Sequence, residues 1–221
     1  MTPSTWRTYL VTQQSLSAGR STVEIVDAAI AGGIDVVQLR EKETDAKWRY
    51  ELGTELRELT AEADVSLIVN DRVDVARAID ADGVHVGQSD LPVAVARELL
   101  GPEAIVGCSA STVPEAEAAE ADGADYLGVG SVYGTASKNV PADEEGIGPE
   151  RIAVIADAVS IPTIGIGGIT AANAAPVVEA GAAGVAVISE ITTADDPRAA
   201  TESLAAAVET GKATDRGGTG V

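Results

Sequence analysis

Short apolar runs rich in Val, Ile and Leu alternate along the chain with longer segments that carry apolar residues at helical spacing. The runs lie at residues 9–12, 35–39, 66–70, 83–87, 105–109, 126–130, 163–167 and 184–189. Between them, segments such as 48–63 and 114–121 are rich in Ala, Glu and Leu and are predicted to be helices. Strand–helix alternation repeated in this way predicts an α/β fold, a single (β/α)8 TIM barrel, for which about 200–250 residues is a usual length.

We expect one catalytic barrel domain over residues 1–210, because no change of composition divides the chain and 221 residues with 45% hydrophobic content can bury one core. Residues 211–221 are rich in Gly and Thr without apolar periodicity and are predicted to form a disordered tail. A doubly wound open sheet is the alternative architecture, but it would place a glycine-rich dinucleotide turn after the first strand. The chain has Gln-Gln-Ser-Leu at 13–16 instead, so the barrel is favoured.

The chain is acidic, with a formal net charge of −20 and a pI near 4.2. Nucleic-acid backbones bind to basic surfaces, so this charge argues against a nucleic-acid partner. The acidic composition resembles that of proteins from salt-loving archaea, in which surface carboxylates maintain solubility. Aromatic residues make up only 3% and Phe is absent, which favours a core of Val, Ile, Leu and Ala packed against parallel strands.

The cysteine content and the hydropathy of the sequence indicate where in the cell the protein is expected. The single cysteine, Cys108, excludes an intramolecular disulfide, and no apolar stretch reaches the roughly 18–20 residues that a membrane helix needs. Residues 1–7 lack the apolar run of a signal peptide. We therefore expect a soluble, cytoplasmic protein without a membrane partner.

Polar residues follow the apolar runs, at the strand ends where barrel enzymes hold their reacting groups. The second run leads through Gln38 to Arg40 and Lys42. In extended chain residues 40 and 42 lean to the same side, and two cations together in so acidic a chain suggest an anion site, such as one for a diphosphate. The alternative is a set of exposed salt bridges to Glu41 or Glu43, which are common and contribute little. This segment alone does not decide between them.

Two carboxylates follow the next two runs. Asp71 comes after Asn70 at the end of the third run, and Asp90 follows the fourth. Asn and Asp also cap helices, and a helix is expected over 73–79, which would explain one of them. Two oxygen donors on neighbouring loops, with room for water and phosphate oxygens, are nevertheless what Mg²⁺ usually takes. Asp71 and Asp90 are therefore candidate metal ligands.

Three further residues lie in or at the ends of these runs. His85, the one histidine of the sequence, could be a general base, but its place inside a strand favours a structural role. Cys108 is expected to be a small core residue, because no basic neighbour is evident to lower the pKa of its thiol. Ser109 lies at the end of the fifth run and is a candidate site residue.

The loop after the sixth run carries hydroxyls and a base. Thr135, Ser137 and Lys138 follow a glycine-rich stretch, so backbone and side-chain donors could converge there on phosphate. The alternative is an ordinary flexible loop. The continuation over 139–148 is longer than most βα connections and is a candidate lid.

The seventh and eighth runs end in small residues. Gly167 and Gly168 follow the seventh run, and Ile188 and Ser189 end the eighth. In barrels these positions often form a monophosphate site from backbone N–H groups. One cationic site with a metal and one neutral backbone site together predict two small phosphorylated substrates.

Six short motifs occur in the order in which thiamine phosphate synthases carry them. They are Gln-Leu-Arg-Glu-Lys at 38–42, Asn-Asp at 70–71, Gly-Val-His-Val-Gly-Gln-Ser-Asp at 83–90, Gly-Cys-Ser at 107–109, Thr-Ala-Ser-Lys at 135–138 and Ile-Gly-Gly-Ile at 166–169. The chain resembles this family from residue 9 to residue 190. The resemblance implies a transferase that joins 4-amino-2-methyl-5-pyrimidinylmethyl diphosphate to 4-methyl-5-(2-phosphooxyethyl)thiazole. The products would be thiamine phosphate and pyrophosphate, formed with Mg²⁺ by a dissociative carbocation mechanism.

The resemblance also implies roles for individual residues. The diphosphate would be held by Arg40, Lys42 and Lys138, and Mg²⁺ by Asp71 and Asp90. The pyrimidine or its diphosphate would contact Gln38, Asn70 and Ser109. The thiazole would lie near Thr135 and Ser137, with its phosphate among Gly167, Gly168, Ile188 and Ser189.

One departure and three alternatives accompany the resemblance. The family often has Phe-Pro-Thr-x-Thr-Lys where this chain has Tyr-Gly-Thr-Ala-Ser-Lys at 133–138, so both hydroxyls and the ammonium are kept but Gly replaces a rigid Pro. A thiazole tautomerase of the same barrel family would need no diphosphate site. A sugar-phosphate isomerase would need a base such as His85 facing its substrate. A non-catalytic phosphate-binding barrel is the third alternative, and a homo-oligomer is compatible with any of them.

Overall fold

The computed structural model describes residues 2–134 and 146–217. In this part of the chain the strands form a closed barrel in sequence order, each parallel to its neighbours, and the last strand pairs with the first. The strands are β1 (Thr8–Val11), β2 (Val36–Leu39), β3 (Ser66–Asn70), β4 (Gly83–Val86), β5 (Ile105–Ala110), β6 (Tyr126–Gly130), β7 (Thr163–Ile166) and β8 (Gly184–Val187). The predicted (β/α)8 barrel is confirmed.

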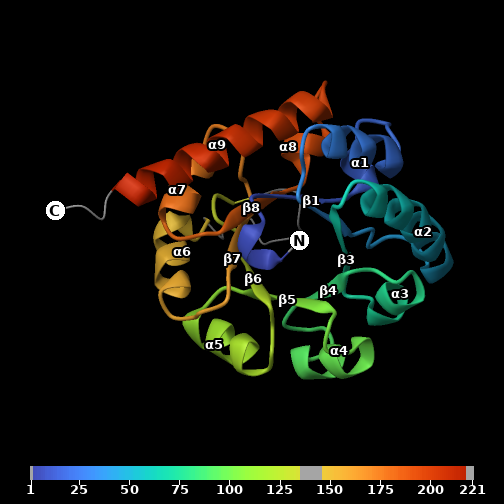
Figure 1. Cartoon of the computed structure of the whole chain (residues 1–221), viewed down its shortest axis with the longest axis horizontal. Helices are drawn as coiled ribbons and strands as arrows, with labels where there is room; N and C mark the ends of the chain where they lie inside the picture. The colour runs from blue at the N-terminus through green and yellow to red at the C-terminus, as the bar shows by residue number, and fades with distance from the viewer. Residues whose placement is uncertain (1, 135–145, 218–221) are drawn as a thin grey trace.

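Helices surround this barrel as a ring, and the N-terminal segment lies at the centre of the ring (Figure 1). The helices are α1 (Thr22–Ala31), α2 (Ala46–Glu62), α3 (Val73–Ala78), α4 (Val93–Leu100), α5 (Val113–Ala121), α6 (Gly148–Ala156), α7 (Ala174–Glu179), α8 (Ser189–Thr192) and α9 (Pro197–Gly217). Two 3₁₀ turns, η1 (Pro3–Thr5) and η2 (Gln14–Leu16), flank β1. Among the described residues, none of these helices combines the length and the apolarity that crossing a membrane requires.

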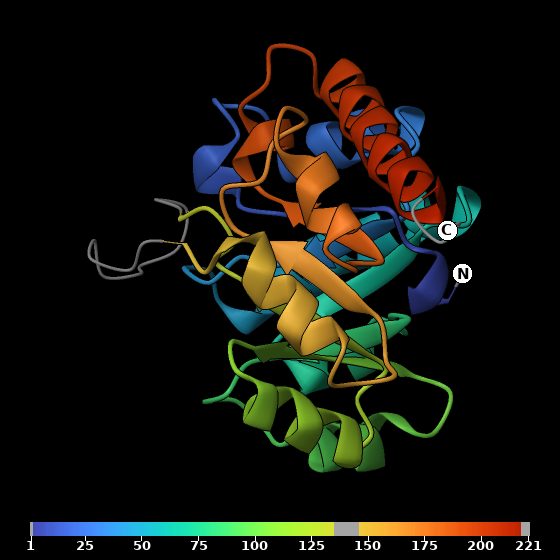
Figure 2. The ribbon, with the colours of Figure 1, turned by 90° about the vertical axis from the view of Figure 1, so that its left-hand side faces the viewer.

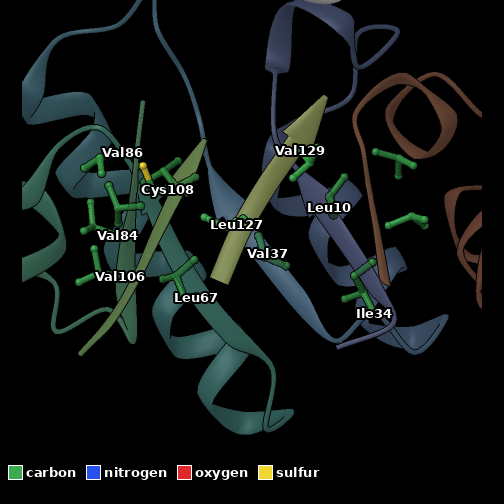
Figure 3. Packing of buried hydrophobic residues seen from close by; sticks show 14 of the residues in the cluster. Leu10, Ile34, Val37, Leu67, Val84, Val86, Val106, Cys108, Leu127 and Val129 are labelled. Carbon is green, nitrogen blue, oxygen red and sulfur yellow. The ribbon is translucent and has the colours of Figure 1, made fainter. Parts of the chain in front are cut away.

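Alternation along the strands divides the buried residues into two layers. Side chains such as Leu10, Val37 and Leu67 point outward and pack against the helices (Figure 3). The neighbouring positions point into the barrel, where an inner apolar cluster includes Trp6 and Ile68. Because side chains alternate across a strand, the polar residues of the inner layer are carried to the barrel axis by the same pattern that builds the outer core.

Helix α9 extends further than the sequence suggested. Residues 211–217 continue the helix instead of forming the disordered tail that was expected from residue 211, while 218–221 lie outside the described residues. Leu204 and Val208 are fully buried on one face, and a Cβ added at Gly211 would lie only 2.7 Å from the carbonyl oxygen of Ala175 in α7. Gly211 lets α9 pack closely against α7. It interrupts the apolar pattern of the sequence, but it does not end the helix. Figure 2 shows α9 lying along the outside of the barrel.

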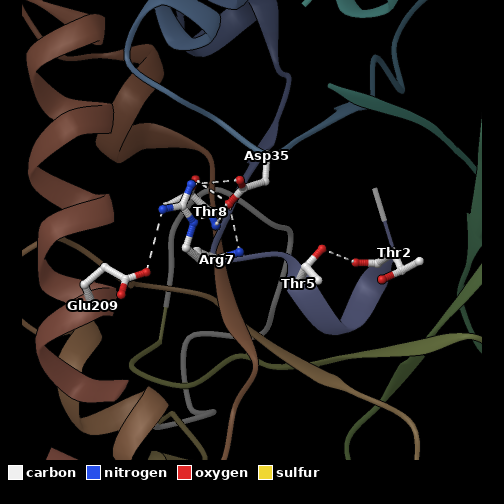
Figure 4. A network of polar contacts seen from close by, with 6 residues as sticks. All are labelled: Thr2, Thr5, Arg7, Thr8, Asp35 and Glu209. Carbon is white, nitrogen blue, oxygen red and sulfur yellow. Dashed lines mark hydrogen bonds and ion pairs between the residues drawn. The ribbon is translucent and has the colours of Figure 1, made fainter. Parts of the chain in front are cut away.

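A buried carboxylate fixes the start of the barrel. Asp35 accepts hydrogen bonds from the backbone N–H groups of Arg7 (2.9 Å) and Thr8 (3.0 Å), and its other oxygen accepts from the Arg7 guanidinium at 3.1 Å (Figure 4). Arg7 also approaches Glu209 of α9 at 3.7 Å. The carboxylate thereby connects the entry to β2 with the first strand and, through Arg7, with the last helix.

Replacing Asp35 by alanine is expected to lower the free energy of unfolding by about 2–4 kcal/mol, because two backbone N–H groups and the guanidinium lose their acceptor. Urea denaturation followed by circular dichroism measures this. The matched control is Glu202→Ala, which removes the exposed partner of Arg198 on α9 and should change stability little. Equal effects of the two substitutions would contradict the structural role of Asp35.

Candidate functional site

The inward-facing polar side chains line a cavity at the carboxyl ends of the strands. Its walls come from all eight strands and the β2–α2 loop: Tyr9, Val11, Gln38, Arg40, Asn70, His85, Ser109, Tyr126, Gly128, Ile164, Ile166 and Ala186. Four of the predicted site residues, Gln38, Arg40, Asn70 and Ser109, therefore meet in one place. The apolar part of the wall lies on β7, β8 and β1, and the polar side chains on β2 to β5 lie across the cavity from it.

A larger hollow, of about 640 Å³, lies at the opposite end of the barrel. Three of the charged side chains that line it are already paired: Arg57 with Asp82 at 2.8 Å, and Asp125 with the neighbouring Arg97. The amino-terminal end of a barrel stabilises the fold, whereas reactions take place at the carboxyl end. The smaller cavity is therefore the candidate active site.

Arg40 is held at the edge of this cavity by the β1–α1 loop. Its backbone N–H donates to the hydroxyl of Thr12 (3.1 Å), and its Nη1 donates to the side-chain amide oxygen of Gln13 (3.1 Å). Burial lowers the pKa of Arg40, while the negative charges of Asp71 and Glu41 act in the opposite direction. A half-buried guanidinium with few protein partners retains donors for an anionic ligand.

Among the described residues, Glu41 forms none of the salt bridges that were the alternative for this segment. Its carboxylate accepts from the backbone N–H of Gln14 (3.1 and 3.0 Å) and from the hydroxyl of Thr22 at 3.2 Å, and it is only 7% exposed. From α2, Arg49 donates to the carbonyl oxygens of Glu41 (2.8 Å) and Lys42 (2.9 Å). These bonds fix the loop that carries both cations, a role of Glu41 and Arg49 that was not predicted from the sequence.

The predicted metal ligands lie beside these cations. Asp71 pairs with the Lys42 ammonium at 3.4 Å, and Asp90 accepts from the backbone N–H of Gly87 at 2.7 Å. Burial raises the pKa of Asp71, the neighbouring carboxylate of Asp90 raises it further, and Lys42 opposes both. The described residues contain no group of three or more His, Cys, Asp or Glu side chains suited to a metal ion, so this site offers a pair of carboxylates.

Neither polar residue at the end of β3 caps the helix that follows. Arg72 occupies the N-cap position of α3, without a side-chain capping bond. Asp71 has a φ of 61°, a left-handed conformation that is uncommon for a residue other than glycine. The helix-capping interpretation of Asn70 and Asp71 is therefore wrong, and the turn directs Asp71 toward Lys42 and Asp90.

His85 lies inside the barrel and contacts a predicted site residue. Its Nε2 is 2.9 Å from the hydroxyl of Ser109, and its Nδ1 is 3.0 Å from the hydroxyl of Tyr126. The side chain is 9% exposed. The strand position of His85 had favoured a structural role, and the geometry adds that this histidine lines the cavity and is bonded to Ser109.

The ends of β6 and β7 lie against each other. A Cβ added at Gly168 would be 2.3 Å from the carbonyl oxygen of Gly134, and one at Gly167 would be 2.3 Å from the hydroxyl of Ser131, so both glycines are needed for this close approach. Ile188 is buried at the end of β8 and Ser189 is exposed at the start of α8. The predicted residues Thr135, Ser137 and Lys138, and most of the candidate lid at 139–148, lie outside the described residues.

Cys108 faces away from the cavity. Its side chain packs in the outer layer with Val84 and Val86 (Figure 3), as its place next to the inward-facing Ser109 requires. Burial, together with the charges of Glu115, Asp122 and Asp90, raises the pKa of its thiol to about 11.

Alkylation of Cys108 by iodoacetamide at pH 8 is expected to be roughly 100-fold slower in the folded protein than in guanidinium chloride, because the reactive thiolate is scarce when the pKa is raised. Mass spectrometry of timed samples gives both rates. Labelling of the folded protein at the unfolded rate would show that the thiol is neither buried nor protonated.

Comparisons with known proteins agree with this geometry. A family model described as thiamine monophosphate synthase matches residues 8–191. The thiamine-phosphate synthase of Haloarcula marismortui is 63% identical over 208 residues, which cover 94% of this chain and 99% of the relative. That of Moorella thermoacetica is 53% identical over 199 residues, covering 90% and 94%.

A solved structure also resembles this chain over almost its whole length. The thiamine phosphate pyrophosphorylase of Pyrococcus furiosus superposes with a TM-score of 0.86 at 42% identity, covering 95% of this chain and 98% of that one. The chain therefore belongs to the thiamine monophosphate synthase family and, like the relatives named thiamine-phosphate synthase, is a transferase.

Proposed function

We propose that this enzyme condenses 4-amino-2-methyl-5-pyrimidinylmethyl diphosphate with 4-methyl-5-(2-phosphooxyethyl)thiazole to give thiamine phosphate and pyrophosphate. The observation that carries the proposal is that Arg40, which lines the cavity, lies near the charge of Asp71, and that Asp71 is itself paired with Lys42 and neighbours Asp90, in a chain of net charge −20. Cations placed beside carboxylates in this way suit a diphosphate bound together with a divalent metal ion.

The carboxylate pair fits Mg²⁺. Asp71 and Asp90 are close enough to raise the pKa of Asp71, and one ammonium, that of Lys42, lies opposite them. Two negative charges in a partly buried site favour a hard divalent cation with oxygen ligands, and Asp71 and Asp90 would hold it. When bound there, Mg²⁺ would supply a positive charge that stabilises the departing diphosphate.

The reaction that fits these residues begins with departure of the diphosphate. The C–O bond to the pyrimidine methylene breaks, and its electron pair leaves with pyrophosphate. Arg40 and Lys42, and by family resemblance Lys138, stabilise the charge that grows on the leaving group. The backbone of Arg40 and of Lys42 is already held by Thr12 and Arg49, so little reorganisation of these two residues is needed during the reaction.

The cation left on the pyrimidine then bonds to the thiazole nitrogen, and no protein nucleophile is required. Ile164, Ile166 and Ala186 form an apolar wall that limits access of water, which would otherwise trap the cation. The thiazole phosphate would bind among Gly167, Gly168, Ile188 and Ser189, with Thr135 and Ser137 near the ring. Binding both substrates in one cavity orients the nitrogen toward the reacting carbon.

The test is incubation of the purified protein with both substrates and Mg²⁺ in molar salt. Thiamine phosphate and pyrophosphate should form in equal amounts, and omission of either substrate should abolish both products. Consumption of a thiazole phosphate tautomer alone would indicate the tautomerase activity instead. Binding of both compounds without product would indicate a non-catalytic phosphate-binding barrel.

A further inference from the structure

A series of hydrogen bonds crosses the barrel interior among the side chains that line the cavity. The side-chain amide nitrogen of Gln38 donates to the hydroxyl of Tyr9 (2.7 Å), which is 2.9 Å from the hydroxyl of Tyr126. Tyr126 is in turn 3.0 Å from His85 Nδ1, and His85 Nε2 is 2.9 Å from the hydroxyl of Ser109. Five strands, β1, β2, β4, β5 and β6, thus contribute one residue each.

The direction in which each of these hydrogen bonds is donated follows from the first of them. Tyr9 accepts from Gln38, so its own proton goes to Tyr126, its other hydrogen-bonding neighbour. Tyr126 then donates to His85 Nδ1, which places the proton of the neutral imidazole on Nε2, where it is donated to Ser109. Because its amide nitrogen is directed to Tyr9, Gln38 keeps its amide oxygen as an acceptor, in addition to the second hydrogen of that nitrogen, and Ser109 keeps its hydroxyl proton as a donor.

Packing fixes the rings that transmit this direction. A Cβ added at Gly107 would lie 2.1 Å from Tyr126 Cζ, and one at Gly128 would lie 2.9 Å from His85 Cε1, so the Tyr126 ring occupies space left by a glycine on β5 and the His85 ring space left by one on β6. Trp6 packs edge-on against Tyr126, with ring centroids 5.0 Å apart. Tyr9 and Tyr126 are 2% and 1% exposed, so water does not compete for their hydroxyls.

We propose that Tyr126 and His85 are positioning residues that, together with Tyr9, fix Gln38 as an acceptor and Ser109 as a donor and so select a heterocycle carrying an amino group beside a ring nitrogen. The inference rests on the proposed function, because it assigns the pyrimidine to the cavity that these two side chains line. An aminopyrimidine donates through its amino group and accepts at its ring nitrogen. A 4-oxo pyrimidine presents the opposite pattern and leaves buried polar groups unmatched.

The first test removes one phenolic hydroxyl from this series of hydrogen bonds. Tyr126→Phe is expected to raise the KM for the pyrimidine diphosphate about 5- to 10-fold, the usual effect of losing one buried hydrogen bond, and to leave the KM for the thiazole phosphate within about twofold of wild type. The control is Tyr50→Phe, which removes a hydroxyl from an exposed ring on α2 and should change neither constant. A merely structural role would shift both KM values together or neither.

The second test uses unreactive inhibitors that resemble the pyrimidine diphosphate, with carbon in place of the scissile oxygen. Wild type should bind the 4-amino inhibitor at least about 10-fold more tightly than the 4-oxo inhibitor. In Tyr126→Phe the ratio of the two dissociation constants should fall below about threefold. If Tyr126→Phe is too unstable to assay, Tyr9→Phe, which removes the acceptor of Gln38, carries the same expectation. An unchanged ratio in the folded variant overturns the inference.

Two outcomes separate this inference from the proposed function. If wild type makes no thiamine phosphate, the proposed function fails. If wild type makes it while the tyrosine variants keep both their KM for the pyrimidine and their preference for the amino inhibitor, only the positioning role fails.

Discussion

Replacing Arg40 by alanine is expected to lower kcat by about 10²- to 10³-fold, the usual effect of removing one fixed donor to charge that develops in a transition state. The guanidinium lines the cavity and is partly buried, and its backbone is fixed by Thr12. The charge that it would stabilise grows as the C–O bond breaks, so the effect should fall on kcat more than on KM. Steady-state kinetics with saturating thiazole phosphate measures both constants.

Two variants serve as controls. Arg198→Ala removes the same group from an exposed position on α9 and should leave turnover unchanged. Arg40→Lys keeps the charge but loses the planar set of donors, so its activity should lie between those of wild type and Arg40→Ala. Near-normal turnover of Arg40→Ala, with an unchanged thermal midpoint, would mean that the diphosphate does not bind at this edge of the cavity.

The sequence predicted the features that depend on local periodicity. Apolar runs separated by helical segments predicted the barrel, and the polar residues after these runs predicted that Gln38, Arg40, Asn70 and Ser109 would lie at the same end. The structure places these four around one cavity. Strand alternation was sufficient for this, because the carboxyl ends of parallel strands in a closed barrel must converge.

The features that depend on contacts between distant strands could not be predicted. Tyr9 and Tyr126 stand 117 positions apart, and alternation places both inside the barrel without stating that their hydroxyls meet at 2.9 Å. Glu41 could have paired with either neighbouring cation, and only the fold brings Gln14 and Thr22 within reach of its carboxylate. Residue type identifies the chemistry at such positions, whereas the partner is set by tertiary packing.

Asp71→Asn is expected to change activity and stability in opposite directions. Loss of one carboxylate should raise the Mg²⁺ concentration for half-maximal rate at least about 10-fold, since Mg²⁺ requires anionic oxygen ligands. In EDTA at pH 7, however, the variant should be more stable than wild type, because burial and the charge of Asp90 raise the pKa of Asp71 and make its ionised form unfavourable in the folded state. Asparagine also tolerates the left-handed backbone at this position.

The sign of this stability difference between Asp71→Asn and wild type follows from its dependence on pH. A carboxyl whose pKa is raised in the folded state stabilises the fold below its unfolded pKa of about 3.9, and this stabilisation is lost as the pH rises through the folded pKa. The advantage of Asp71→Asn should therefore be absent at low pH and complete once Asp71 is ionised. Urea denaturation in EDTA at several pH values, alongside an Mg²⁺ titration of the rate, measures both effects.

Asp74→Asn is the matched control, three residues further along. Its hydrogen bond from Arg72 lowers the pKa of Asp74, so this carboxylate stabilises the fold above its unfolded pKa and loses that contribution on acidification. Asp74→Asn should therefore lower stability at pH 7 and leave the Mg²⁺ titration unchanged. An Asp71→Asn variant that was less stable than wild type in EDTA would mean that the ion pair with Lys42 outweighs burial and the charge of Asp90. An unchanged Mg²⁺ requirement in both Asp71→Asn and Asp90→Asn would remove this pair as the metal site.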